Sequence, residues 1–265
     1  MRFIQRSVFA LMLAAPLAAQ AAWPEQPVRI VVGYSPGGTT DILARALGEQ
    51  LSERLGQPVL IENKAGAAGS LGAALVQQAS PDGHTLFMAT VASHGINPSL
   101  YRKTLPYKPE AFEPVGMVAS IPLMLITTPG FAPKTVGQLL DLASEKPGSL
   151  NYSSSGNGSP GHLAAAMFTS SAGLDIVHIP YRGGAQANVA VMANALLAPK
   201  GTPAAVIERL NAAIGEAMAA PALKKRFEGE GATPAPGTPA ALAATIEAEM
   251  VRWAKVVELT GIKIA

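Results

Sequence analysis

The sequence contains no cysteine among its 265 residues, and charged side chains make up only 14% of it. Without cysteine, neither disulfide bonds nor thiolate chemistry can contribute to stability or catalysis. The low charge, combined with 49% hydrophobic residues, excludes a disordered chain. We therefore expect the fold to be held together by the burial of a hydrophobic core.

Basic patches with interleaved aromatic residues are also missing, as are metal-binding clusters, and the short basic run at residues 224–226 is interpreted as a solvated helix face. No stretch rich in lysine or arginine is interleaved with aromatic residues, so nucleic acid is not an expected partner. The histidines, His84, His94, His162 and His178, stand singly, without a histidine or cysteine at metal-ligand spacing. We predict no metal site and no cofactor, and retain His94 and His162 only as possible ligand contacts because both lie near the ends of predicted strands.

The first 21 residues have the features of a secretory signal peptide. Arg2 and Arg6 precede an apolar run over residues 8–15, and the small-x-small pattern of a cleavage site follows at residues 19–21. A membrane anchor would need roughly 20 uninterrupted apolar residues, and Pro16 interrupts the run. We therefore predict export to the periplasm with cleavage near Ala21, which leaves 244 residues with 18 basic and 18 acidic side chains.

The mature chain alternates strand-like and helix-like segments. Strands are predicted over residues 28–32, 59–62, 85–89, 150–153 and 175–179, and helices over residues 41–55, 70–79, 136–144, 162–171, 185–193, 203–218 and 239–259, with a further short helix around residues 224–226. The apolar run 115–128 is long enough to cross between two lobes. This alternation predicts parallel, doubly wound α/β sheets, and either one large or two smaller domains.

The first strand leads into residues 31–41, which read VVGYSPGGTTD and match the G-x-S-x-G elbow of serine hydrolases. The elbow needs an oxyanion hole, and one of its donors is the backbone N–H of the residue after the nucleophile. That residue is Pro36, which has no N–H. A secreted esterase that uses Ser35 therefore remains only an alternative, and we expect no enzyme.

A second glycine motif, G-x-G-x-x-G at residues 156–161, matches the fingerprint of dinucleotide-binding proteins. That site also needs an acidic residue about 20 positions later, at the end of the next strand. Ile176 stands at the expected spacing, and Asp175 lies at the start of the strand instead of at its end. We therefore do not expect a nicotinamide cofactor.

Both loops share a physical property that suits anions. Each follows a strand and leads into the start of a helix, where backbone N–H groups are unpaired and carry partial positive charge. Hydroxyl groups add donors at Ser35, Thr39, Thr40, Ser153, Ser154, Ser155 and Ser159. For either loop alone, a tight turn between strand and helix explains the composition better. Two such loops in two α/β blocks favour capture of a carboxylate between lobes.

Many short motifs, in order along nearly the whole chain, carry a resemblance to one family. They are Trp23-Pro24, Ser35-Pro36-Gly37-Gly38 with Asp41, Glu62-Asn63-Lys64, Gly66-Ala67-Ala68-Gly69, Pro81-Asp82-Gly83-His84, Asn97-Pro98-Ser99-Leu100-Tyr101, Tyr152-Ser153-Ser154-Ser155-Gly156, His162-Leu163-Ala164, His178-Ile179-Pro180-Tyr181-Arg182-Gly183 and Pro199-Lys200-Gly201-Thr202-Pro203. On these residues the chain resembles the periplasmic receptors of tripartite tricarboxylate transporters, also called the Bug family.

The resemblance implies a two-lobed periplasmic binding protein of the α/β class that closes on a small carboxylate and delivers it to membrane permease subunits. We expect it to act as a monomer. The ligand contacts that it implies are Ser35, Gly37, Gly38, Thr39, Thr40, Asp41, Ser93 and His94 in the first lobe, and Ser153, Ser154, Ser155, Gly156, Ser159, His162, Tyr181, Arg182 and Gly183 in the second. The expected first lobe covers residues 22–118 and 198–265.

The expected second lobe, residues 119–197, is shorter than the family pattern. Family members have another strand, a return crossing and further loops after the Tyr-Arg-Gly-Gly loop, whereas here residues 190–194 run almost directly into residues 195–199. Such a loss is expected to leave an unpaired sheet edge and exposed apolar surface. Weaker binding or none, as in a degenerate paralogue that no longer transports, is therefore an alternative.

Overall fold

The computed structural model describes residues 23–154, 156–181 and 194–262. Its strands are β1 (Val28–Val32), β2 (Val59–Asn63), β3 (Thr85–Thr90), β4 (Phe112–Ser120), β5 (Asn151–Ser154), β6 (Val177–Pro180), β7 (Asn194–Pro199) and β8 (Thr233–Pro234). Its helices are α1 (Thr39–Leu55), α2 (Ser70–Gln77), α3 (Asn97–Leu100), α4 (Val136–Glu145), α5 (Pro160–Ser171), α7 (Ala204–Ala219), α8 (Pro221–Gly229) and α9 (Pro239–Thr260), with short helical turns η1 (Ala67–Gly69), η2 (Ala92–Ile96) and η3 (Pro109–Ala111). The predicted helix 185–193 lies outside the described residues.

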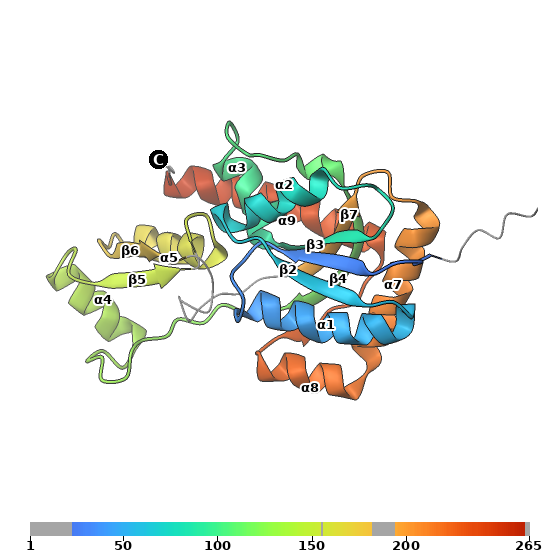
Figure 1. The fold of residues 1–265 in the computed structure, drawn as a ribbon. Coiled ribbons are helices and arrows are strands. Elements are labelled where there is room, and N and C mark those ends of the chain that lie inside the picture. The colour runs from blue at the N-terminus through green and yellow to red at the C-terminus, as the bar shows by residue number, and fades with distance from the viewer. Residues whose placement is uncertain (1–22, 155, 182–193, 263–265) are drawn as a thin grey trace, which may run out of the picture.

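Six strands form the main sheet, in the order β2-β1-β3-β7-β4-β8 (Figure 1). β1 pairs in parallel with β2 and β3, as the alternation of strands and helices predicts. The expectation of an all-parallel sheet is wrong, because β7 lies antiparallel between β3 and β4. The sequence analysis missed β7 as a strand. Its six residues are all buried, so its side chains show no alternation between polar and apolar.

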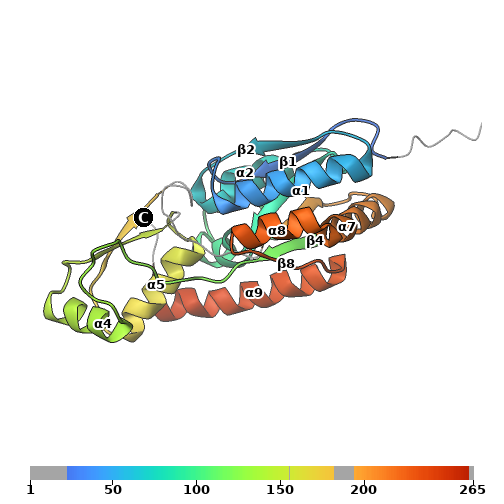
Figure 2. The same cartoon turned by 90° about the horizontal axis from the view of Figure 1, so that it is seen from below.

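Helices cover both faces of this sheet, and side chains alternate between two cores. Val28, Ile30 and Val32 of β1 face a core formed with α1, α7 and α8, whereas Val31 faces a core formed with α2 and α9. Figure 2 shows α1, α7 and α8 on one side of the strands. Burial on both faces explains why four of the five residues of β1 are apolar, with Arg29 the exception. None of the described helices combines the length and apolar character that crossing a membrane requires.

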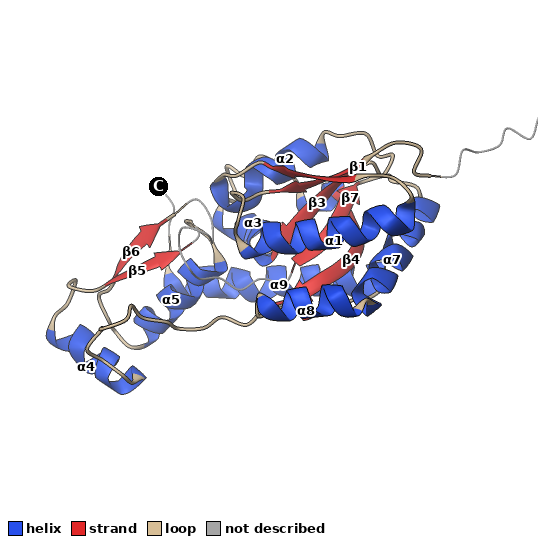
Figure 3. Cartoon of the chain, turned by 60° about the horizontal axis from the view of Figure 1, so that its bottom comes forward, coloured by secondary structure: helices blue, strands red, loops and turns tan. Residues whose placement is uncertain are grey.

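The second lobe is small. Its sheet has two parallel strands, β5 and β6, accompanied by α4 and α5 (Figure 3). Few side chains of its described helices are buried: Leu139 and Ala143 in α4, and Pro160, His162 and Leu163 in α5. The two-lobed α/β architecture expected from the sequence is confirmed, and the second lobe contributes little core of its own.

Several connections join the lobes. One is the covalent link from β4 to α4, in which the apolar residues Leu123, Met124, Leu125 and Ile126 are 38–69% exposed. Another is the packing of α5 against the end of α9, where Leu163 is fully buried against Trp253 and Val256. The Tyr101 hydroxyl, just after α3, also donates to the Asn157 carbonyl at 3.1 Å. The expected lobe boundaries at residues 118 and 197 both fall inside strands of the main sheet, β4 and β7.

Candidate functional site

The loop between β1 and α1 ends in a helix start that no side chain caps. Gly38 is the N-cap residue, with extended backbone angles. Thr40 and Asp41, which the sequence makes plausible N-cap residues, lie inside the helix instead. The backbone N–H groups of the first helical residues, Thr39 and Thr40, have no acceptor within the helix and lie at its positive end. This geometry can hold an anion.

Asp41 lies in the first turn of α1 but faces the protein. Its carboxylate accepts hydrogen bonds from the Gly37 N–H at 2.9 Å, from the Arg45 guanidinium at 2.9 and 3.0 Å, and from the Asn63 amide at 2.9 Å. Burial raises the pKa of Asp41, but these hydrogen bonds, led by those from Arg45, outweigh it, so the pKa lies below its usual range. The carboxylate and the Gly37 N–H therefore hold the loop in shape, and neither is open to a ligand.

The second-lobe loop between β5 and α5 is held by its own polar groups. Ser159 caps α5 by accepting a hydrogen bond from the His162 N–H at 3.3 Å. The Ser154 hydroxyl is fully buried and accepts a hydrogen bond from the Gly156 N–H at 3.2 Å. The Tyr181 N–H donates to the Ser154 carbonyl at 2.9 Å, and the Tyr181 side chain is exposed. Ser154 therefore shapes this loop from within.

Three rings stack beneath this loop. The His162 and His178 rings lie 3.9 Å apart and 8° from parallel, and Tyr152 stacks on His178 at 4.9 Å. The His178 Nε2 atom lies 2.6 Å from the Ser154 hydroxyl, and the Gly158 N–H donates to His162 Nδ1 at 3.1 Å. Burial, and then the neighbouring His178, lowers the pKa of His162 to about 4, and burial lowers the pKa of His178. Both rings are neutral near pH 7.

Ser93 and His94 lie in the core instead of in the site. Ser93 is fully buried, and its hydroxyl donates to the Thr90 carbonyl at 3.0 Å. The His94 ring packs edge-on against Phe112 and is 3% exposed. Burial lowers the pKa of His94 to about 3. The structure encloses both side chains in the first lobe, so a ligand contact by Ser93 or His94 stays a prediction.

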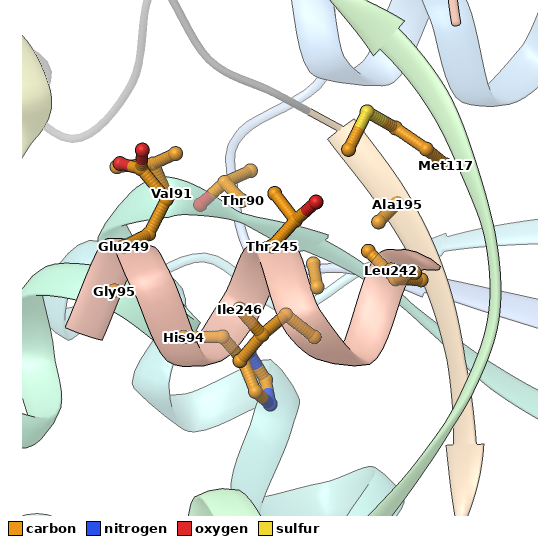
Figure 4. Close-up of a pocket in the computed structure, with 11 residues that line it drawn as sticks. Thr90, Val91, His94, Gly95, Met117, Ala195, Leu242, Thr245, Ile246 and Glu249 are labelled. Carbon is orange, nitrogen blue, oxygen red and sulfur yellow. The ribbon is translucent and has the colours of Figure 1, made fainter. Parts of the chain in front are cut away.

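A small pocket lies beside His94, between α9 and the end of β3 (Figure 4). Its volume is about 30 Å³, and its lining includes Thr90, Met117, Leu242 and Thr245. That volume is about the share of one water molecule in liquid water, whereas sites for small ligands occupy roughly 300–1,000 Å³. The pocket is therefore too small for a carboxylate, and it lies apart from the two glycine-rich loops.

The predicted residues thus fall into distinct groups. Ser35, Gly38, Thr39 and Thr40 belong to the first-lobe loop and the start of α1, and Ser153, Gly156, Ser159 and Tyr181 belong to the second-lobe loop region. Gly37, Asp41, Ser154 and His162 brace the loops from within. Ser155, Arg182 and Gly183 lie outside the described residues.

The sequence analysis missed four bracing residues: Arg45, Asn63, Tyr152 and His178. Asp41 and Arg45 are four residues apart in a helix, a spacing that favours an ion pair and was available as a signal. No local spacing joins Asp41 to Asn63 or Ser154 to His178, because the first contact crosses from α1 to β2 and the second from β5 to β6.

Comparison with known proteins identifies the family. A family model described as the tripartite tricarboxylate transporter family receptor matches residues 43–195. The chain belongs to this receptor family. A UPF0065 protein of Bordetella pertussis is 37% identical to this receptor over 187 residues, which cover 71% of this chain and 58% of that protein. BugT of the same organism is 29% identical, over 95% of this chain and 94% of BugT.

Solved structures share the fold of this receptor. The periplasmic binding protein BugD is 26% identical and aligns with a TM-score of 0.85, covering 91% of this chain and 99% of BugD. Rpa4515 of R. palustris with adipate has the same TM-score and coverage at 28% identity. MatC from Rhodopseudomonas palustris with bound malate is 26% identical and aligns with a TM-score of 0.81, over 88% of this chain and 99% of MatC. Relatives of this receptor therefore bind dicarboxylates.

This receptor is shorter than its relatives. The alignment with BugT runs over 308 residues, at least 43 more than the 265 residues of this chain can fill. BugT therefore has residues within the aligned region that have no counterpart here. The internal shortening expected from the sequence agrees with this difference and with the two-stranded sheet of the second lobe.

Proposed function

We propose that the chain is a periplasmic receptor that captures a small carboxylate between its two lobes, as a monomer, and delivers it to the membrane permease subunits of a tripartite tricarboxylate-type transporter. The observation that carries the proposal is the uncapped start of α1, which offers unpaired N–H groups in a chain of this receptor family. In Figures 1 and 2, α1 and α5 both begin on the side of their lobe that faces the other lobe.

The ligand class proposed for this chain is a dicarboxylate. Rpa4515 and MatC, the relatives solved with adipate and malate, support this choice. The start of α1 would hold one carboxylate through the N–H groups of Thr39 and Thr40 and the hydroxyl of Ser35. The second-lobe loop between β5 and α5 would hold the other carboxylate, with the Ser153 hydroxyl as one donor. The Tyr181 side chain, which directly follows β6, would cover the carboxylate held by the second-lobe loop.

We expect malate or adipate to raise the melting temperature of the mature chain. A ligand that binds only the folded state stabilises it by about 2.7 kcal/mol at 100 times its dissociation constant. The measurement is a thermal-shift screen of malate, adipate and citrate at neutral pH, with the corresponding diamides as uncharged controls. Equal shifts with acids and diamides, or no shift at millimolar concentrations, would contradict the proposed function.

One observation favours a second candidate function, a degenerate paralogue that no longer transports. The apolar residues Leu123–Ile126 are exposed in the link between the lobes, and the second-lobe sheet has two strands among the described residues, in a chain shorter than its relatives. On this hypothesis the second lobe is marginally stable and binding is weaker than in a full-length relative such as BugT. Cooperative unfolding of the whole chain together with tight binding of malate or adipate would refute it.

Ser35→Ala separates a receptor from a secreted esterase. We expect the wild-type chain to hydrolyse p-nitrophenyl acetate no faster than buffer, because Pro36 supplies no N–H to an oxyanion hole. We expect Ser35→Ala to weaken dicarboxylate binding by about two- to tenfold through the loss of one hydrogen bond. Ester turnover in the wild-type chain that disappears in Ser35→Ala would favour the enzyme.

A further inference from the structure

The ring stack beneath the second-lobe loop ties three elements of that lobe together. Tyr152 comes from β5, His178 from β6 and His162 from the first turn of α5. His178 reaches the loop through the Ser154 hydroxyl, and His162 reaches it through the Gly158 N–H. Few side chains of the described second-lobe helices are buried, so this stack is an important support of the loop.

The hydrogen bond from the Gly158 N–H fixes the protonation state of His162. An N–H group donates only to a ring nitrogen that carries no proton, so Nδ1 of His162 is unprotonated and the ring is neutral. Protonation at Nδ1 would remove this acceptor and place two donors against each other. The Gly158 N–H would then lose its partner.

His178 is constrained less strictly. The Ser154 hydroxyl can donate to His178 Nε2, or it can accept from that atom and turn its own proton to the Gly156 carbonyl, 3.1 Å away. A charge on His178 is nevertheless unfavourable, because the parallel His162 ring lies only 3.9 Å away in a buried position. The two rings are therefore coupled, and a proton on either makes a proton on the other less favourable.

We propose that His178 and His162 are positioning residues that hold the second-lobe loop in its binding form only while both rings are neutral, so that the carboxylate is released as the surroundings become acidic. The proposal rests on the proposed function, since it assigns a role to residues around the same site. The proposal adds His178 to the residues that shape the site. His178 belongs to β6 and not to the loop, and it supports the loop through the Ser154 hydroxyl.

The charged and titratable groups around the stack do not favour an imidazolium. On β5, burial raises the pKa of Tyr152 to about 12, so this side chain stays neutral. On α3, the Tyr101 hydroxyl donates to the Asn157 carbonyl, and burial raises its pKa. The end of α9, which packs against α5, carries Glu249, Arg252, Lys255 and Glu258. Among the described residues, only His178 acts on the pKa of His162 through its charge.

The direction of the pH effect follows from these pKa values. The unfolded chain, with an ordinary histidine pKa of about 6.5, binds more protons than the folded chain between about pH 6.5 and 4. Both the stability of the second lobe and the binding form of its loop are therefore complete above pH 6.5. Both are lost progressively as the pH falls toward 4.

The first test measures ligand affinity against pH by calorimetry with malate and adipate. His178→Phe keeps the stacked ring but removes the bond to Ser154, and we expect it to weaken binding at pH 7.5 by about three- to tenfold. Because malate and adipate themselves titrate in acid, each variant is compared with His84→Gln. His84 is buried at the amino end of β3, away from both loops, and its variant gives the reference pH profile.

We expect the wild-type chain and His84→Gln to lose affinity in parallel as the pH falls from 6.5 to 4, the interval over which His162 takes up a proton. The variants His178→Phe and His162→Phe should lose less affinity over the same pH interval, because each removes one of the two coupled histidines. Wild-type affinity with a wild-type pH profile in His178→Phe would overturn the proposal.

The second test needs neither a variant nor a ligand. Histidine ring signals in the NMR spectrum of the ligand-free chain should titrate with a pKa near 4 for His162 and below 6.5 for His178. The amide signal of Gly158 should move with the same midpoint. The proposal would be overturned if both rings had ordinary histidine pKa values. It would also be overturned if the chemical shift of the Gly158 amide did not change as the rings titrate. If wild-type chain binds neither malate nor adipate, the proposed function fails, and this titration still decides the role of the histidine pair.

Discussion

Gly33→Ala is expected to destabilise the chain by about 3 kcal/mol, near the upper end of the usual cost of overpacking. A Cβ atom at Gly33 would lie 2.5 Å from the Cα atom of Gly69 and 2.9 Å from its carbonyl oxygen. Both are backbone atoms, so the clash cannot be relieved by turning a side chain. The loop after β1 would have to move away from η1, and the start of α1 with it.

The midpoint of urea unfolding measures this loss, and dicarboxylate affinity reports the displacement of the loop. Gly215→Ala is the matched control. Gly215 lies in the exposed part of α7, and an added Cβ there meets no atom within 4 Å. Alanine is the better helix former by up to about 1 kcal/mol, so the control should be neutral or stabilising. Equal unfolding midpoints for the two variants would contradict the close approach of Gly33 to Gly69.

Leu163→Ala should separate the second lobe from the first. Leu163 is fully buried between Ile96, Trp253 and Val256, and it is the main apolar anchor of α5. Removing a buried leucine side chain costs about 2–5 kcal/mol. Because the second lobe has little core of its own, we expect it to detach at a urea concentration at which the six-stranded sheet is still folded.

Trp253 fluorescence follows this detachment, and a Trp23→Phe background removes the other tryptophan signal. Met167→Ala is the matched control on the same helix, where the side chain is 43% exposed. Met167→Ala should change the free energy of unfolding by no more than about 0.5 kcal/mol. A single transition with an unchanged midpoint in Leu163→Ala would show that the packing of α5 on α9 does not hold the lobes together.

Local sequence patterns predicted most of the fold. The β-branched run of β1, the apolar spacing of α1 and the glycine that ends α1 are all signals carried by neighbouring residues. Gly56 does end α1, in the left-handed conformation. β7 was missed because a strand buried on both faces carries no alternation, and its antiparallel direction depends on neighbours far away in sequence.

The candidate site was predicted less completely than the fold. Its two loops were recognised because glycine and hydroxyl residues between a strand and a helix are a local pattern. The bracing contacts were not, since Asp41 meets Asn63 across 22 residues and Ser154 meets His178 across 24. His94, close to the end of a strand in sequence, is enclosed by Phe112 and other rings that only the folded chain brings together.

By itself, the sequence determined the α/β units, the family resemblance and the two loops that start α1 and α5. It also determined that Ser35 is followed by a residue without an N–H, which removes one donor of a hydrolase site. Only the tertiary structure decided which polar groups remain open to a ligand. The side chains of Asp41 and Ser154 form hydrogen bonds within the protein. β2 brings Asn63 to Asp41, and β6 brings His178 to Ser154. Which amides and hydroxyls remain for a carboxylate depends on these long-range contacts.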